Sequence, residues 1–185
     1  MGIGPLMTGN RAVFLDRDGV LNQTIVRNGK PFPPENLSGM VINPDAMIAL
    51  PKLKALGFLL IVVTNQPDVG RGTQNRDVVE EMHQALQAQL PLDDFFVCYH
   101  DDRHGCDCRK PLPGLLLQAA ERHGISLSSS FLIGDRWRDV DAGHQAGVQS
   151  ILIDYHYDER GPDHEPDAHV NSLLEASNWI AARQV

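Results

Sequence analysis

Residues 11–20 read RAVFLDRDGV, an apolar run that ends abruptly in an Asp-Arg-Asp-Gly turn. Short apolar runs bounded by turn residues are typical of strands buried on both faces, as in parallel sheets. Asp16 and Asp18 would leave such a strand at its carboxyl end, where open α/β sheets bind their ligands. The segment therefore predicts a buried strand that delivers two carboxylates into a loop.

Strands and helices alternate along the rest of the chain. Apolar runs predict further strands, at residues 58–64, 95–99, 131–134 and 150–154. Capped or amphipathic stretches predict helices, at residues 44–56, 75–90, 113–123, from 135 to about 146, and from Ser172 onward. Pro51 predicts a kink or a late start in the first helix, and residues 155–167 are expected to form a polar loop. The alternation predicts an α/β fold with a doubly wound, mostly parallel, Rossmann-like sheet.

Composition narrows the class of protein. Hydrophobic residues make up 42% of the 185-residue chain, enough for one domain, which we expect over residues 11–183 after a flexible lead-in over residues 1–10. The net charge of −8 argues against nucleic acid or anionic membranes as partners. No apolar run approaches the ~20 residues that span a bilayer, and no signal peptide is recognisable. We expect a cytoplasmic protein, a monomer, that binds a small anionic molecule.

Four polar segments fit this plan, three of them at the ends of predicted strands. They are residues 16–20, 64–66, 109–111 and 134–139. Paired carboxylates bind hard cations such as Mg²⁺, while hydroxyls, backbone amides and lysines suit phosphate oxygens. Singly, each segment has an ordinary explanation: an Asp-Gly turn, a polar strand end, a surface lysine, an acid at a helix start. A calcium loop fits poorly, because the position of its bidentate glutamate falls on Arg27. The joint order of the segments favours phosphate chemistry.

All three cysteines lie in one polar loop together with a histidine. The spacing Cys98-x-His100-x5-Cys106-x-Cys108 offers three thiols and an imidazole, a tetrahedral Zn²⁺ set with no open position for catalysis. His104 is a competitor for His100, and scattered buried thiols are the alternative. A disulfide scaffold would spread an even number of cysteines along the chain, so we expect a structural zinc in a reducing compartment.

In the four polar segments the chain resembles the haloacid dehalogenase superfamily of phosphatases, over roughly residues 11–180. The resemblance implies that Asp16 is the nucleophile and Asp18 the general acid and base. It further implies that Thr64 and Lys110 stabilise the phosphoryl group. A phosphate monoester is doubly anionic, so a carboxylate can approach it only where cations offset the repulsion.

The resemblance also implies a magnesium site. Its ligands would be the carboxylates of Asp16 and Asp135 and the main-chain carbonyl of Asp18, while Asp139 would orient other groups. Asp16 would then form an aspartyl-phosphate, which divides one difficult step into two. Asp18 would have to be protonated to assist the leaving group in the first of these steps.

The Cys-Asp-Cys-Arg-Lys-Pro run resembles the zinc-bearing branch of the superfamily that lacks a cap domain. This branch includes phosphatases of heptose bisphosphate and of histidinol phosphate. Residues 65–67 and 70–72 resemble the heptose enzymes, whereas the five-residue gap between His100 and Cys106 resembles the histidinol-phosphate domain. Residues 24–37, expected at the substrate, match neither pattern.

We expect a small phosphorylated metabolite as substrate, a heptose bisphosphate first and histidinol phosphate as the alternative. Substrate-binding residues would be Asn65, Gln66, Arg109 and Arg136. Two guanidinium groups suit a substrate with a second anionic end. A zinc-stabilised binding module without catalysis is a further alternative, but it would not need the proton-transferring Asp18.

Overall fold

Six parallel strands form the central sheet of the computed structural model, which describes residues 9–184. The strands are β1 (Ala12–Leu15), β4 (Leu59–Asn65), β5 (Asp94–Cys98), β6 (Phe131–Gly134), β7 (Gln149–Ile153) and β8 (Ala168–Val170). Their spatial order, β5-β4-β1-β6-β7-β8, is 3-2-1-4-5-6 when they are counted along the chain. This is the order of a doubly wound Rossmann-like sheet, and the chain reverses its direction of winding between β1 and β6. The predicted fold class is confirmed.

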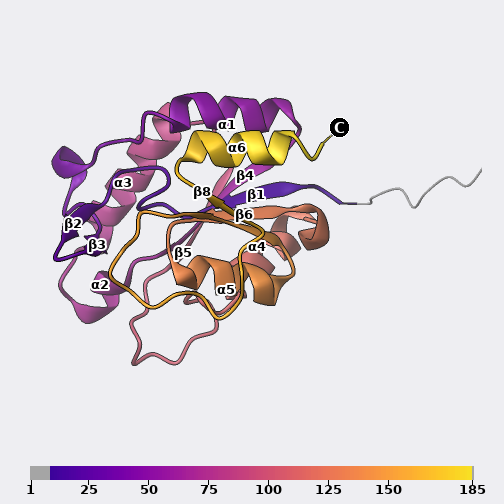
Figure 1. The fold of residues 1–185 in the computed structure, drawn as a ribbon. Helices are drawn as coiled ribbons and strands as arrows, with labels where there is room; N and C mark the ends of the chain where they lie inside the picture. Colours follow the sequence, from indigo (N-terminus) through magenta and orange to yellow (C-terminus); the bar gives the residue numbers. More distant parts are fainter. Residues whose placement is uncertain (1–8, 185) are drawn as a thin grey trace, which may run out of the picture.

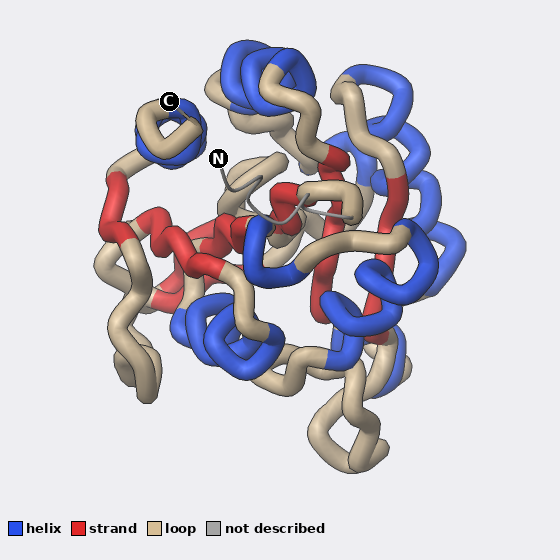
Figure 2. The backbone as a smooth tube through the Cα atoms, turned by 90° about the vertical axis from the view of Figure 1, so that its right-hand side faces the viewer, coloured by secondary structure: helices blue, strands red, loops and turns tan. Residues whose placement is uncertain are grey.

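Helices cover both faces of this sheet (Figures 1 and 2). On one face lie α1 (Ala46–Ala55), α3 (Arg76–Gln89) and α6 (Leu173–Ala181), and on the other α4 (Gly114–His123) and α5 (Trp137–Ala146). α1 and α6 run side by side above the sheet in Figure 1, with α5 below it. The short helix α2 (Pro67–Arg71) and two short 3₁₀ helices, η1 (Leu37–Gly39) and η2 (Leu127–Ser129), complete the helical elements of the described residues.

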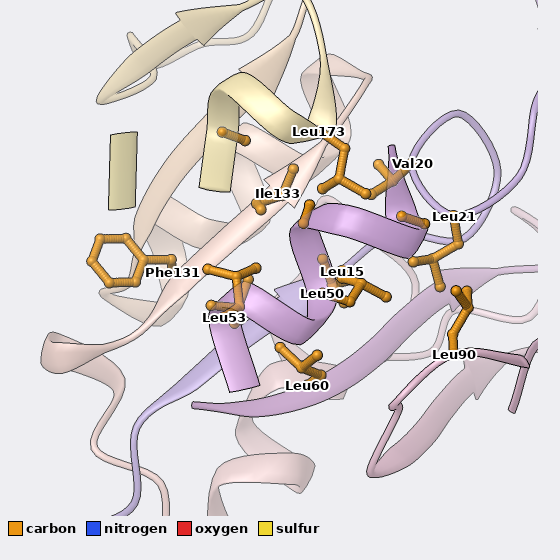
Figure 3. Close-up of a cluster of buried hydrophobic side chains, with 14 of the residues drawn as sticks. Leu15, Val20, Leu21, Leu50, Leu53, Leu60, Leu90, Phe131, Ile133 and Leu173 are labelled. Atoms are coloured by element: carbon orange, nitrogen blue, oxygen red, sulfur yellow. The ribbon is translucent and has the colours of Figure 1, made fainter. Parts of the chain in front are cut away.

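β1 shows why its residues had to be apolar on both faces. Val13 and Leu15 belong to the core beneath α1 and α6, whereas Ala12 and Phe14 belong to the core over α4 and α5. Figure 3 shows Leu15 meeting Leu50 of α1 within the first core. A strand at the centre of a doubly wound sheet has no solvent face, so its sequence cannot alternate with polar residues.

Apart from the two 3₁₀ helices, three short features were not predicted. They are the hairpin of β2 (Ile25–Arg27) and β3 (Lys30–Phe32), the helix α2 (Pro67–Arg71), and β8. The hairpin turns at Asn28 and Gly29, both with positive φ (51° and 73°), the residue pair typical of a type I′ turn. Its strands carry no buried face, so they lack the apolar pattern on which strand prediction depends.

Two predictions concern the start of the chain and α1. α1 begins at Ala46, two residues after the predicted Pro44, and retains Pro51 in its interior. The residue four positions before Pro51 is the exposed Met47, whose carbonyl water can reach in place of the missing amide. The predicted lead-in over residues 1–10 falls mostly on residues 1–8, which lie outside the described part. Within residues 9–184 no helix combines the length and apolarity needed to cross a bilayer.

Candidate active site

The carboxyl ends of β1, β4 and β6 open into a cavity of about 320 Å³. It lies where the sheet reverses its winding, the place at which open α/β sheets bind ligands. The predicted site residues that line the cavity are Asp16, Asp18, Asn65, Gln66, Arg109, Lys110, Asp135 and Arg136, joined by Asp139. Thr64 does not line the cavity. Its hydroxyl accepts a hydrogen bond of 3.0 Å from Nε2 of Gln66, and Gln66 does line the cavity. The fold therefore brings all four polar segments together.

Lys110 is buried at the centre of the site. Its Nζ lies 3.1 Å from Asp16 Oδ1 and 2.6 Å from Asp139 Oδ1, and it donates to the Val63 carbonyl at 2.8 Å. Burial would lower the pKa of Lys110, but the charges of Asp139 and Asp16 outweigh burial and raise it. Lys110 is thus held fully charged beside the carboxylate that would attack phosphorus.

Asn65 fixes the backbone of Lys110. Its Nδ2 donates to the Lys110 carbonyl at 2.9 Å, and its Oδ1 accepts from the Lys110 amide at 3.0 Å. The predicted substrate-binding role of Asn65 therefore competes with a structural one that the side chain already fulfils. Because both amide atoms are used, Asn65 sets the position from which the Lys110 side chain reaches Asp16.

Three buried carboxylates form a candidate Mg²⁺ site. Oxygens of Asp16, Asp135 and Asp139 all lie within 4.8 Å of one another. Asp135 Oδ1 is buried without a hydrogen-bond partner, which a hard cation would supply. Burial raises the pKa of Asp16 to about 6 against the opposing Lys110 charge, and burial with the Asp16 and Asp139 charges raises that of Asp135 well above its usual range. The donor set fits Mg²⁺, which prefers carboxylates and would favour their charged forms.

Gly19 is required for this cluster to close. Its φ is +84°, and a Cβ atom placed there would lie 1.9 Å from Asp135 Oδ2. Any other residue would be strained at this φ and would displace the Asp135 carboxylate. The glycine of the Asp-Arg-Asp-Gly turn therefore lets Asp16 and Asp135 approach the same point.

Asp18 points away from the three acids and into a buried polar network. It accepts hydrogen bonds from Arg17 Nη2 (3.0 Å), Asn22 Nδ2 (2.9 Å) and Gln66 Nε2 (2.9 Å). Burial would raise the pKa of Asp18, but Arg17, Asn22 and Gln66 lower it below the usual value. This geometry favours the carboxylate, the form needed to deprotonate water, and works against the protonated form that assists a leaving group.

Arg17 was not predicted as a site residue, although it is fully buried. Besides Asp18 it contacts Gln66 Oε1 at 3.2 Å and His83 Nε2 of α3 at 3.2 Å. Burial and the nearby Arg17 charge lower the pKa of His83 to about 4, so the ring is neutral and its Nε2 can accept a hydrogen bond from Arg17 Nη1. In the sequence, the only sign of a role for Arg17 is its position between two aspartates. His83 lies 66 residues away, and nothing near it in the sequence indicates its contact with Arg17.

The four predicted zinc ligands converge at one point. Cys98 Sγ lies 3.7 Å from Cys106 Sγ, 3.0 Å from Cys108 Sγ and 3.7 Å from His100 Nδ1. Ligands about 2.0–2.3 Å from a tetrahedral Zn²⁺ lie roughly 3.3–3.8 Å apart. The two 3.7 Å separations fall in this range and the 3.0 Å separation of Cys98 and Cys108 is shorter, so the three thiols and one imidazole could hold that ion after a small outward shift of one thiol. His104 stands outside the group, with its Nδ1 2.7 Å from Asp101 Oδ1.

Four arginines line the cavity, and they differ in their partners; Arg71 pairs with Asp68. Arg136 forms an ion pair with Glu159, donating from both Nε and Nη2. Arg109 donates to Asp102 at 2.9 Å and leaves its buried Nη1 unpaired. Arg138, which was not predicted, has no acidic partner among residues 9–184. Burial and the charges of Arg109 and Arg136 lower the pKa of Arg138, so an anion between these guanidinium groups would be stabilised.

Two further segments enclose the cavity. The hairpin contributes Lys30 to Pro33, so the segment expected to contact the substrate does line the site. The loop between β7 and β8 contributes Glu159, and its Tyr157 donates to Asp135 Oδ2 at 3.0 Å. This loop was predicted only as polar, since neither residue forms part of a recognisable motif.

Comparisons with known proteins agree with this geometry. The sequence model of a family described as HAD-hydrolase-like matches residues 107–176. D-glycero-beta-D-manno-heptose-1,7-bisphosphate 7-phosphatase of Helicobacter pylori is 37% identical over 153 residues, 80% of this chain and 85% of the relative. D-glycero-alpha-D-manno-heptose-1,7-bisphosphate 7-phosphatase of Mycobacterium bovis is 40% identical over 146 residues, 74% of this chain and 73% of the relative.

A solved structure is similar over almost the whole chain. It is D,D-heptose 1,7-bisphosphate phosphatase from B. bronchiseptica, complexed with magnesium and phosphate. The two folds superpose with a TM-score of 0.80 at 26% identity, covering 94% of this chain and 99% of the other. The likeness therefore concerns the fold of nearly the whole chain.

Proposed function

The chain belongs to the heptose bisphosphate phosphatase family of haloacid dehalogenase-like hydrolases, and we propose that it removes one phosphate from a heptose bisphosphate with the help of Mg²⁺. The observation that supports this most strongly is the position of Lys110, which lies between the carboxylates of Asp16 and Asp139 at the carboxyl end of the sheet. This arrangement places a fixed cation beside a nucleophilic oxygen, as attack on a phosphate dianion requires.

Asp16 acts as the nucleophile in this proposal. One of its carboxylate oxygens attacks phosphorus, the bond to the sugar oxygen breaks, and an aspartyl-phosphate forms. Water then attacks the phosphoryl group, releasing inorganic phosphate and restoring the carboxylate. Lys110 stabilises the phosphoryl oxygens, and Thr64 acts indirectly, by accepting a hydrogen bond from Gln66 at the end of β4.

Asp18 is the proton-transferring group. In its protonated form it gives its proton to the leaving sugar oxygen, and the resulting carboxylate, the form that its hydrogen bonds favour, then accepts a proton from the attacking water. Arg17, Asn22 and Gln66 hold Asp18 for this transfer by their hydrogen bonds.

Mg²⁺, held by Asp16 and Asp135 and by the main-chain carbonyl of Asp18, would neutralise phosphate charge, with Asp139 orienting Lys110.

The preference for a bisphosphate rests on Arg109 and Arg138. Both line the cavity, Arg109 Nη1 lacks a partner, and no acid of the described chain pairs with Arg138. A second phosphate would satisfy both guanidinium groups. Histidinol phosphate offers an amine and an imidazole instead, and would need unpaired acids at the rim. The three rim acids are each paired with an arginine: Asp68 with Arg71, Asp102 with Arg109, and Glu159 with Arg136.

Steady-state kinetics at neutral pH test the substrate. We expect kcat/KM for a heptose bisphosphate to exceed that for histidinol phosphate by at least about 10-fold, equal to about 1.4 kcal/mol in transition-state binding. An aryl phosphate assayed with and without Mg²⁺ serves as the control for chemistry that does not depend on the substrate. Equal or faster turnover of histidinol phosphate would reject the bisphosphate assignment while leaving the phosphatase chemistry in place.

Replacing Arg138 tests the second phosphate site. Arg138→Met keeps the apolar stem but removes charged hydrogen bonds worth about 1.5–3 kcal/mol each, so KM for the bisphosphate should rise about 10-fold or more. KM for a sugar monophosphate should change little. Arg122→Met, at an exposed arginine of α4 outside the cavity, is the matched control. If KM were unchanged for both substrates, Arg138 would have no role in binding the second phosphate.

The remaining assignments follow from the chemistry. Zn²⁺ is the structural ion at Cys98, His100, Cys106 and Cys108, and reduced thiols at these positions suit the cytoplasm. A monomer is sufficient, because every residue proposed for catalysis comes from one chain. The net charge of −8 disfavours nucleic acid as a partner.

A further inference from the structure

Two tyrosines from the loop after β7 reach into the active site. The hydroxyl of Tyr155 donates to the Gly19 carbonyl at 3.0 Å, and that of Tyr157 donates to Asp135 Oδ2 at 3.0 Å. Each tyrosine therefore contacts one of the two loops that carry the candidate Mg²⁺ ligands. The loop lies more than 15 residues beyond Asp135 in the sequence, and no motif in it indicated such contacts.

The residue between the two tyrosines adopts an uncommon backbone conformation. His156 has φ 56°, in the left-handed region, which is unfavourable for a residue other than glycine. Asp154 holds this turn by accepting from the His156 amide at 2.8 Å, while the His156 ring itself is exposed. Such strain persists where the surrounding structure requires it, and here it allows both neighbouring rings to face the site.

The two oxygens of Asp135 have unequal surroundings. Oδ2 accepts from Tyr157, whereas the buried Oδ1 has no partner. Within residues 9–184, Tyr157 makes the one side-chain hydrogen bond to this carboxylate. Without that bond the carboxylate could rotate about χ2, a broad torsion with no strong minimum of its own. The tyrosine hydroxyl therefore decides which oxygen is free.

We propose that Tyr157 is a positioning residue that orients Asp135 so that Oδ1 is presented to Mg²⁺. The proposal rests on the proposed function, in which Asp135 is a magnesium ligand. It assigns to Tyr157 the task that a hydrogen-bonded partner performs for a ligating carboxylate in many metal sites. The uncharged hydroxyl orients the ligand without adding a charge that would compete with the cation.

Thr24 extends this arrangement to the wall of the cavity. Its Oγ1 lies 3.0 Å from the Tyr157 hydroxyl. Because Tyr157 gives its single proton to Asp135, Thr24 donates to the tyrosine oxygen. Thr24 lines the cavity just before β2. The Tyr157 hydroxyl therefore connects the start of the hairpin with Asp135, the proposed metal ligand.

Tyr157→Phe tests the proposal with Mg²⁺ as the probe. The change removes one oxygen, and calorimetric titration of the zinc-loaded protein with Mg²⁺, without substrate, should show a Kd raised at least about 10-fold. Tyr99→Phe is the matched control. It removes the same atom from a tyrosine that donates to Glu80, a carboxylate outside the cluster of Asp16, Asp135 and Asp139, and should leave the Kd for Mg²⁺ unchanged.

The outcomes separate this inference from the proposed function. If wild-type protein bound no Mg²⁺, the proposed function itself would fail. Wild-type binding with an unchanged Kd in Tyr157→Phe would overturn the positioning role alone. A positioning role also predicts that kcat recovers to within about threefold at saturating Mg²⁺, since Tyr157 does not touch the reacting atoms. A merely structural role would instead lower Tm and leave the Kd for Mg²⁺ unaltered.

Discussion

Asp16→Asn should abolish turnover while the protein remains folded. An amide cannot attack phosphorus to form the acyl phosphate, and removing a catalytic group costs at least about 10²-fold in kcat. Steady-state hydrolysis of an aryl phosphate at saturating Mg²⁺ measures the loss. In parallel, rapid acid quench and mass spectrometry should detect a phosphoryl adduct on the wild-type chain and none on the variant. Residual activity above roughly a tenth of wild type would contradict covalent catalysis by Asp16.

The same substitution should not lower stability in the absence of Mg²⁺. Asp16, Asp135 and Asp139 are buried close together, and within residues 9–184 Lys110 is the one cation in ion-pair contact with any of them. Asparagine retains the shape and removes one of the repelling charges, so Tm should stay level or rise. Asp77→Asn, at an exposed acid in the first turn of α3, controls for a general effect of charge. A large fall in Tm would mean that the loss of turnover reflects unfolding.

Signals that are local in sequence predicted most of the site. The apolar run before Asp16, the strand end at Thr64 and the spacing of the zinc ligands each lie within a few residues. Their assembly then follows from topology, because the carboxyl ends of neighbouring parallel strands meet at one edge of the sheet. Hence Asp16, Lys110 and Asp135 lie together as the sequence indicates.

Partner choice could not be predicted in the same way. Arg136 and Arg138 both follow Asp135 and look equivalent in the sequence, but Glu159, 23 residues beyond Arg136, pairs with that arginine and leaves Arg138 free for a ligand. Likewise, Asn65 fixes the backbone of Lys110, 45 residues away. Such contacts depend on loop conformation and on competition between side chains for the same partner, which no local pattern encodes.

The two histidines of the zinc loop should differ in their importance for zinc binding. His100→Ala removes one of four converging ligands, so elemental analysis should show loss of the one zinc ion expected per chain. His104→Ala is the matched control, because His104 bonds Asp101 outside the cluster and its loss should leave zinc in place. Tm should fall by about 10 °C in His100→Ala, corresponding to about 3–5 kcal/mol at 2–4 °C per kcal/mol for a chain of this size. Equal zinc contents in the two variants would reject the assignment of His100.

Loss of zinc should also slow catalysis, but without the complete loss expected of Asp16→Asn. Cys108 precedes Lys110 by two residues, so the metal fixes the chain immediately before the phosphate-binding lysine. Asn65 holds the Lys110 backbone independently, and Asp139 holds its Nζ, so the lysine retains two of its constraints when zinc leaves. We therefore expect kcat to fall about 10-fold in His100→Ala, within the range for loss of an outer positioning contact. Hydrogen exchange should quicken across the zinc loop and remain slow in β1 and β4, which also pack into the core beneath α1 and α6, where no zinc ligand lies. Full activity in the zinc-free variant would show that Asn65 and Asp139 position Lys110 without help from the loop.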